Sequence, residues 1–332
     1  MVHDVHAHCI PAALIDLLKI EGHRFGIDFV EGDKGSEVVF AGRVTAGPLR
    51  PYLTDRRQRI EAMDRAGVDV QVLASWIDMT GYSLDGPRGA AYSRLFNEIM
   101  AEEAASDPGR FLALGTVPLQ APEAAAEELE YLVGTLGMVG VEISTTVDGT
   151  DLDQAGLDSF WATAARLSCP VLIHPYQPLA GVVLRNLLDN MIGRPAETTV
   201  AIANLMLSGV FDRHPELTII LVHGGGFLPF QLGRLEHGFR AMPHLAARHA
   251  IRSPAEVARD LYFDTVLHSP AAIAALISLV GADRVLLGSD YPFEMGDLDP
   301  VTTLRATPGV TDQSFAMITE GNLSRIIQGI RR

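Results

Sequence analysis

Short apolar runs alternate with longer amphipathic stretches along the whole chain. The runs are nearly continuous in hydrophobic residues, which is typical of parallel strands buried on both faces. They predict eight strands, at residues 2–8, 68–75, 111–119, 138–145, 169–174, 217–223, 261–267 and 285–290. The stretches between them predict helices, at residues 57–66, 123–136, 157–167, 198–211 and 271–280.

Eight strands that alternate with helices predict an α/β fold, a closed (β/α)8 TIM barrel. The main alternative is an open, doubly wound sheet. That fold expects a glycine-rich phosphate loop after its first strand, and Cys9-Ile10-Pro11-Ala12 is not one. We expect one domain over residues 1–332, because 48% of the residues are hydrophobic and can fill a single large core.

Two of the predicted loops are enlarged. Residues 9–55 separate the first strand from its helix and contain a possible hairpin at 37–43, and residues 175–197 follow the fifth strand. Both insertions leave the carboxyl ends of strands, where the active sites of TIM barrels lie. We interpret them as lids over a site, with a plain surface decoration as the alternative.

The net charge limits the binding partners that we expect, and the cysteine content bears on the cellular location. The formal net charge of −15 repels nucleic acid and anionic membranes, so neither is expected to bind. Two cysteines, Cys9 and Cys169, are too few for a disulfide framework. The first residues lack the pattern of a signal peptide, and no apolar run approaches the roughly 20 residues that span a bilayer. A cytoplasmic location is therefore predicted.

Histidines and one aspartate stand at strand ends. His6 and His8 share one face of the first strand, because side chains alternate along extended backbone. His174, His223 and Asp290 each close an apolar run of their own. A barrel would bring all these ends to one mouth, and imidazole with carboxylate suits Zn²⁺, with Mn²⁺ or Fe²⁺ as alternatives.

The number of metal ions follows from a missing residue type. A two-metal site in such a barrel commonly uses a bridging carboxylated lysine, and no lysine follows Lys34. Glu142, at the end of the fourth strand, could bridge two ions instead. We expect one metal per chain. Asp4 precedes the histidine pair, faces away from it, and is interpreted as a structural hydrogen-bond acceptor.

A single metal with an open position can activate a bound water, provided that a base holds it. His223 is the candidate base, and the alternative is that it is a further ligand. Gly224, Gly225 and Gly226 follow it and permit the backbone to approach a substrate closely. Asp290 could combine metal ligation with proton transfer.

The motifs together resemble the amidohydrolase superfamily, and more narrowly its aminocarboxymuconate-semialdehyde decarboxylase-like branch. The principal matches are Asp4-Val5-His6-Ala7-His8-Cys9-Ile10-Pro11, His174-Pro175, His223-Gly224-Gly225-Gly226, Pro195-Ala196-Glu197-Thr198, Leu232-Gly233-Arg234 and Gly288-Ser289-Asp290-Tyr291-Pro292-Phe293. The resemblance implies a barrel with one zinc ion held by His6, His8, His174 and Asp290. It makes His223 the residue that activates the metal water.

The resemblance also implies substrate-binding residues. Arg234 would bind a carboxylate and reach into the neighbouring subunit of a homodimer. A second arginine of the family lies before the first barrel helix, where Arg50 is the nearest match and Arg43 a competitor. Trp76 and Phe293 are expected to line the pocket.

The function predicted is a metal-dependent, non-oxidative decarboxylase of a small unsaturated or aromatic carboxylic acid, with His223 and Asp290 managing the protons. The alternative is a hydrolase or hydratase that uses the same metal water on an amide, lactone or C=C bond. A metal-binding barrel without activity is a third possibility. Only the first reaction releases CO₂.

Overall fold

The computed structural model of this chain describes residues 1–176, 185–246 and 249–330. All eight predicted strands are present, and each is shorter than predicted. They are β1 (His3–His8), β5 (Val70–Ala74), β6 (Phe111–Ala113), β7 (Val141–Ser144), β10 (Val171–His174), β11 (Ile219–Leu221), β12 (Tyr262–Asp264) and β13 (Val285–Leu286).

The strands form a closed parallel barrel, as predicted. Two parallel sheets, in the orders β1-β5-β6 and β13-β12-β11-β10-β7, make up most of it. A parallel bridge between Gly115 and Val141 joins β6 to β7. At the other seam, Ala7 bridges to Tyr291 and the Val5 amide donates to the Leu287 carbonyl at 2.9 Å. The barrel therefore closes through short backbone contacts just beyond the strand ends.

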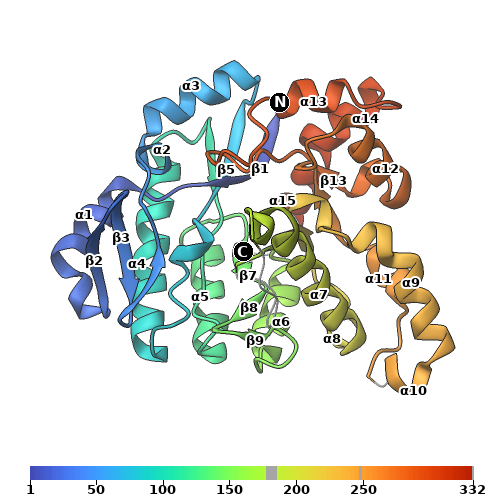
Figure 1. The fold of residues 1–332 in the computed structure, drawn as a ribbon, viewed down its shortest axis with the longest axis horizontal. Coiled ribbons are helices and arrows are strands. Elements are labelled where there is room, and N and C mark those ends of the chain that lie inside the picture. Colours follow the sequence, from blue (N-terminus) through green and yellow to red (C-terminus); the bar gives the residue numbers. More distant parts are fainter. Residues whose placement is uncertain (177–184, 247–248, 331–332) are drawn as a thin grey trace.

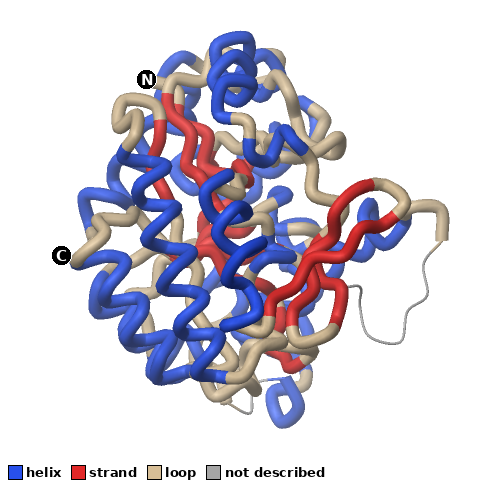
Figure 2. Tube along the Cα trace, turned by 90° about the vertical axis from the view of Figure 1, so that its left-hand side faces the viewer, coloured by secondary structure: helices blue, strands red, loops and turns tan. Residues whose placement is uncertain are grey.

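Helices surround the strands, as both views show (Figure 1; Figure 2). Those predicted from sequence are α3 (Arg56–Ala66), α5 (Pro122–Gly134), α6 (Asp158–Leu167), α7 (Arg194–Leu207) and α12 (Pro270–Val280). Further helices include α4 (Gly86–Ala105), α9 (Leu228–Ala241) and α15 (Asn322–Gly329). Local sequence sets the ends: the Asp55 side chain caps α3 by accepting from the Gln58 amide, and Gly67 ends that helix at φ +69°.

Two buried clusters hold the layers together. The larger one packs the strands against the outer helices. The smaller one gathers side chains from strands all around the barrel, so it fills the barrel interior, and α15 adds Leu323 and Ile326 to it. Members from the strands include Val5, Val72, Leu172, Ile220 and Leu286. This packed interior leaves the carboxyl-end mouth as the place for a site.

The first insertion folds into structure of its own. It contains α1 (Ala12–Glu21) and an antiparallel sheet of β2 (Ile27–Gly32), β3 (Gly35–Phe40) and β4 (Arg43–Ala46), seen at the blue edge of Figure 1. The hairpin predicted at 37–43 is the β3–β4 pair. The second predicted insertion, 175–197, includes residues 177–184, which lie outside the described residues. Within the described part of the chain, no helix has the length and apolarity to cross a membrane.

Candidate metal centre

Two barrel strands, and the segments that follow two others, bring the predicted ligands together. His8 closes β1 two residues after His6, and His174 closes β10. His223 follows β11 and Asp290 follows β13. Nε2 of His6 lies 3.2 Å from Nε2 of His8 and 3.4 Å from Oδ1 of Asp290. Nε2 of His8 lies 3.1 Å from Oδ1 of Asp290, and Nε2 of His223 lies 3.5 Å from its Oδ2.

The geometry suits one cation. One ligand atom from each of His6, His174, His223 and Asp290 lies within 4.8 Å of the other three. His8 adjoins this group, since its ring centroid is 4.9 Å from that of His174. All five predicted residues therefore converge, and the interpretation of His223 as a further ligand stays open on geometry alone.

Outer hydrogen bonds fix how three of the histidines face the centre. Nδ1 of His6 lies 2.7 Å from the Asp264 carboxylate, Nδ1 of His8 lies 2.6 Å from the Ser75 carbonyl, and Nδ1 of His174 lies 2.8 Å from the Pro175 carbonyl. A carbonyl or carboxylate oxygen accepts, so each Nδ1 carries the proton and each Nε2 presents a lone pair inward. This is the arrangement of metal-ligating histidines.

Three buried atoms in the cluster lack a hydrogen-bond partner among the described residues, namely Nε2 of His174, Nδ1 of His223 and Oδ1 of Asp290. Nε2 of His174 points into the centre without a hydrogen-bond partner, and such a buried nitrogen is suited to bind a cation. Nδ1 of His223 also has none, so no outer group fixes its tautomer. His223 thus differs from the other three histidines, and the difference suits a residue that exchanges protons.

The electrostatics differ between the ligands. They favour a neutral His174 beside an ionised Asp290, whereas for His8 burial lowers the pKa but the interactions with Asp290 and Glu142 outweigh it and raise the pKa. Burial, together with the neighbouring histidines, holds the pKa of His174 well below its usual value. Burial alone would raise the pKa of Asp290, but the interactions with His6, His223 and His8 outweigh it and hold that pKa well below its usual range. Deprotonated side chains of this kind are the form that binds a metal.

Asp264 is a functional side chain that the sequence analysis did not identify. It lies on β12, fully buried, and accepts from the Gly224 amide at 2.8 Å and the Val266 amide at 3.1 Å as well as pairing with His6. The available signal was a carboxylate inside the apolar run 261–267. A buried charge needs partners, which pointed to a polar neighbour across the barrel.

Glu142 lies on the outer side of His8. Its Oε1 is 3.8 Å from Nδ1 of His8, the nitrogen turned away from the centre, and its Oε2 accepts from the Ser75 hydroxyl at 3.1 Å. Burial raises the pKa of Glu142 to about 7. Because the carboxylate of Glu142 lies against the outward nitrogen of His8, its position favours one metal over two.

The backbone is strained at two site residues. His223 has φ +54° and Asp290 has φ +58°, a left-handed conformation that costs about 1–3 kcal/mol and clusters at functional sites. Gly224 and Gly225 are required for packing, because an added Cβ would meet Leu267 at 2.6 Å and Phe263 at 2.7 Å. Gly226 lines the pocket, and it too is required for packing, because an added Cβ would meet the Pro195 carbonyl oxygen at 2.1 Å.

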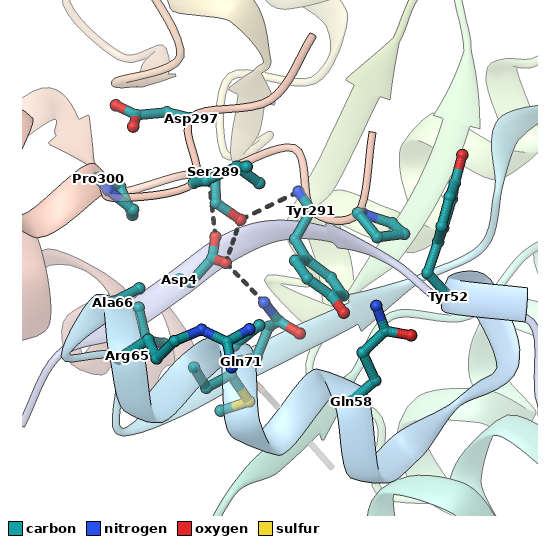
Figure 3. Close-up of a pocket in the computed structure, with 15 residues that line it drawn as sticks. Asp4, Tyr52, Gln58, Arg65, Ala66, Gln71, Ser289, Tyr291, Asp297 and Pro300 are labelled. Carbon is teal, nitrogen blue, oxygen red and sulfur yellow. Dashed lines mark hydrogen bonds between the residues drawn. The ribbon is translucent and has the colours of Figure 1, made fainter. Parts of the chain in front are cut away.

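Asp4 has the structural role that was expected. Strict alternation would place it on the face of His6, but the register of β1 shifts between Asp4 and Ala7. Asp4 instead lines a separate cavity of about 270 Å³ beside α3 (Figure 3). Its carboxylate accepts from the Ser289 amide and hydroxyl, at 3.0 and 2.5 Å, and from Gln71 Nε2 at 2.8 Å. The link to Ser289 fixes the segment that carries Asp290.

A larger pocket of about 790 Å³ opens over the cluster and includes His174, His223 and Asp290 in its lining. Trp76 and Phe293 line it as predicted, with ring centroids 6.0 Å apart. The other lining residues that the argument uses are Asp78, Arg194, Gly226, Phe227, Phe230 and Glu294.

The predicted arginines lie elsewhere. Arg234 on α9 and Arg50 before α2 (Pro51–Thr54) are exposed and are not among the described pocket-lining residues. Arg43, the competitor of Arg50, forms an ion pair with Asp148 at 3.2 Å. The arginine that does line the pocket is Arg194, which the sequence analysis passed over.

Comparisons with known proteins agree with this geometry. The family model described as amidohydrolase matches residues 3–322. The chain is 33% identical over 265 residues to 2-amino-3-carboxymuconate-6-semialdehyde decarboxylase of Dictyostelium discoideum, covering 80% of this chain and 74% of that one. It is 34% identical over 264 residues to gamma-resorcylate decarboxylase of a Rhizobium species, covering 71% of this chain and 76% of that one.

A solved structure gives the same result. The crystal structure of 2,6-dihydroxybenzoate decarboxylase from Rhizobium matches with a TM-score of 0.78 at 27% identity, over 99% of each chain. Family match, relatives and fold agree along nearly the whole chain. This chain therefore belongs to the amidohydrolase family, as an enzyme of its decarboxylase branch.

Proposed function

We propose that this enzyme removes CO₂, without oxidation, from a small aromatic or unsaturated carboxylic acid. The observation that carries the proposal is the buried cluster of His6, His8, His174, His223 and Asp290 at the floor of an aromatic-lined pocket. The relatives named above act as decarboxylases, and their names describe an aromatic acid in one case and an unsaturated acid in the other.

The residues would divide the work as follows. His6, His8, His174 and Asp290 would hold one Zn²⁺, with Mn²⁺ or Fe²⁺ as alternatives, because three imidazoles and a carboxylate suit each of these ions. The bound ion would act as a Lewis acid toward the substrate. Trp76 and Phe293 would contact the flat part of the substrate, since both line the pocket.

Loss of CO₂ replaces a carbon–carboxylate bond with a carbon–hydrogen bond, so the reaction consumes one proton. His223 would deliver it, which is supported by its place in the pocket lining and by the 3.5 Å between its Nε2 and Asp290 Oδ2. Asp290, which is ionised, would orient the imidazole, and solvent water would return the proton to His223. General acid–base assistance of this kind contributes about 10²–10⁴-fold to a rate.

The active form proposed is a homodimer. Arg234 is exposed on α9, and the same helix carries Phe230, half exposed at the pocket. A guanidinium in that position can reach a neighbouring subunit and bind a carboxylate there with paired hydrogen bonds. Arg50 would bind substrate from the first insertion.

A cytoplasmic location of the enzyme stays a prediction.

Product analysis tests the reaction. Zinc-loaded protein is incubated with 2,6-dihydroxybenzoate and related unsaturated acids, and CO₂ and the decarboxylated product are measured together. The proposal expects equal amounts of both, and much slower formation of both with His223→Ala. Consumption of an amide, a lactone or a C=C bond without CO₂ would instead support the hydrolase or hydratase alternative.

A further inference from the structure

The pocket over the metal cluster carries one cationic side chain of fixed charge. Among the described lining residues, Arg194 is the only arginine or lysine. Besides Asp290, two further carboxyl groups, Asp78 and Glu294, line the pocket. An acid that enters therefore meets two acidic groups and needs a compensating positive charge apart from the metal. Arg194 is the described residue that can supply it.

The chain holds Arg194 at the edge of the cluster. It is the first residue of α7, and Pro195 follows within the first turn, a position where proline favours a helix start. Nη1 of Arg194 donates to the Pro175 carbonyl at 2.9 Å. The same carbonyl accepts from Nδ1 of His174 at 2.8 Å. The Pro175 carbonyl oxygen thus accepts hydrogen bonds from both the Arg194 guanidinium and the predicted metal ligand His174.

The guanidinium keeps capacity for a ligand. Its hydrogen bond to Pro175 uses one of five N–H donors, and it is the bond that the structure records for Arg194 among the described residues. Burial raises the pKa of the neighbouring Asp78 to about 6, although the charge of Arg194 opposes the rise. Among the described residues, the structure records no ion pair between Asp78 and Arg194, so Asp78 does not occupy the guanidinium.

We propose that Arg194 binds a carboxylate of the substrate from within the same chain, while the ring contacts the aromatic wall of the pocket. A planar guanidinium offers two parallel N–H groups that match the two oxygens of a carboxylate. The inference rests on the proposed function in one respect, namely that the substrate is an acid. It differs from the role of Arg234, which would act across a subunit boundary.

Ligand binding tests the proposal without requiring turnover. Calorimetry measures the affinity of zinc-loaded protein for 2,6-dihydroxybenzoate and for the uncharged 2,6-dihydroxybenzamide. The wild type is expected to prefer the acid. Arg194→Gln should reduce that preference by about 10- to 100-fold, the range for a hydrogen bond to a charged group, and Arg194→Lys should retain part of it. The control Arg24→Gln, which removes a surface arginine paired with Glu21, should leave it unchanged.

The zinc content of the same samples shows whether Arg194→Gln has lost a substrate contact or has disturbed the metal site. Arg194→Gln is expected to keep its zinc. An unchanged preference in Arg194→Gln, a wild type that does not prefer the acid, or loss of zinc together with the preference would each overturn the proposal. If the preference depends on Arg194 but the wild type releases no CO₂ from any acid, the proposed reaction fails and the role of Arg194 stands.

Discussion

His6 Nδ1 lies 2.7 Å from Oδ2 of Asp264, and both side chains are fully buried. Burial alone would raise the pKa of Asp264, but the interactions with His6 and His223 and the hydrogen bond from the Gly224 amide together outweigh it and lower that pKa, so the carboxylate is ionised. An ionised acceptor fixes the imidazole with its proton on Nδ1 and increases the basicity of Nε2. The pair joins β12, which carries no predicted ligand, to the metal centre on β1.

The first prediction concerns this pair. Asp264→Asn removes the negative charge behind His6, and we expect metal affinity to fall by about 10- to 100-fold with the fold intact. Competition with a chromophoric chelator measures the affinity, and circular dichroism checks the fold. Asp158→Asn, a change at an exposed carboxylate paired with Arg213, is the control. Equal affinity in Asp264→Asn and wild type would contradict the role given to Asp264.

The second prediction concerns the ligands. Replacing His6 or His8 by alanine removes an inner ligand, so most bound metal should be lost. Elemental analysis of the wild type should give about one ion per chain in this site, on the mononuclear argument. A full equivalent of zinc in His6→Ala would contradict the assignment of His6 as a metal ligand. Two tightly bound ions in the wild type would indicate that Glu142 bridges them.

The third prediction separates the two interpretations of His223. As a proton-transfer residue it should be dispensable for metal binding, so His223→Ala should keep its metal and lose roughly 10²–10⁴-fold in rate. Metal content and the rate of CO₂ release are measured on one preparation. Loss of metal along with activity would make His223 a ligand, which its place among the four convergent residues also permits.

The fourth prediction concerns pH and Glu142. Burial raises its pKa to about 7, against an unfolded value of about 4.5, so the folded state binds an extra proton between these pH values. The favourable contribution of the neutral carboxyl is complete below pH 4.5 and is lost as pH rises through about 7. Glu142→Gln cannot ionise, so its stability relative to wild type should increase by about 2–3 kcal/mol between pH 5 and pH 8.

Urea unfolding of chelator-treated protein measures this difference. Metal is removed first because a bound cation would itself lower the pKa of the carboxyl. Glu142→Asp keeps the charge and provides the comparison. A stability difference between wild type and Glu142→Gln that does not vary from pH 5 to pH 8 would show that Glu142 is not the titrating group.

The fifth prediction concerns Arg234. If it binds substrate in the neighbouring subunit, Arg234→Ala should raise KM while leaving metal content and fold intact. Mixing this variant with His223→Ala chains should restore some activity, because a mixed dimer can assemble one complete site. Full activity in a demonstrably monomeric sample, or mixed dimers that stay inactive under exchange conditions, would end the shared-site proposal.

Much of the architecture follows from sequence patterns. Eight apolar runs predicted eight strands, and a polar residue at the end of a run predicted each member of the cluster, because both signals are local along the chain. His6 and His8 needed only the alternation of one strand, and His174 and Asp290 only the rule that parallel strands of a barrel end at one mouth.

Other features depend on distances that no local pattern contains. Asp264 meets His6 only because the barrel closes and brings β12 close to β1, 258 residues apart in sequence. Arg194 enters the pocket because the start of α7 packs against the Pro175 carbonyl, and a register shift in β1 turns Asp4 toward α3. The sequence by itself determined which residues end the strands. Only tertiary packing decided which buried charges face each other, because that choice depends on the register of the closed barrel and the seating of its helices.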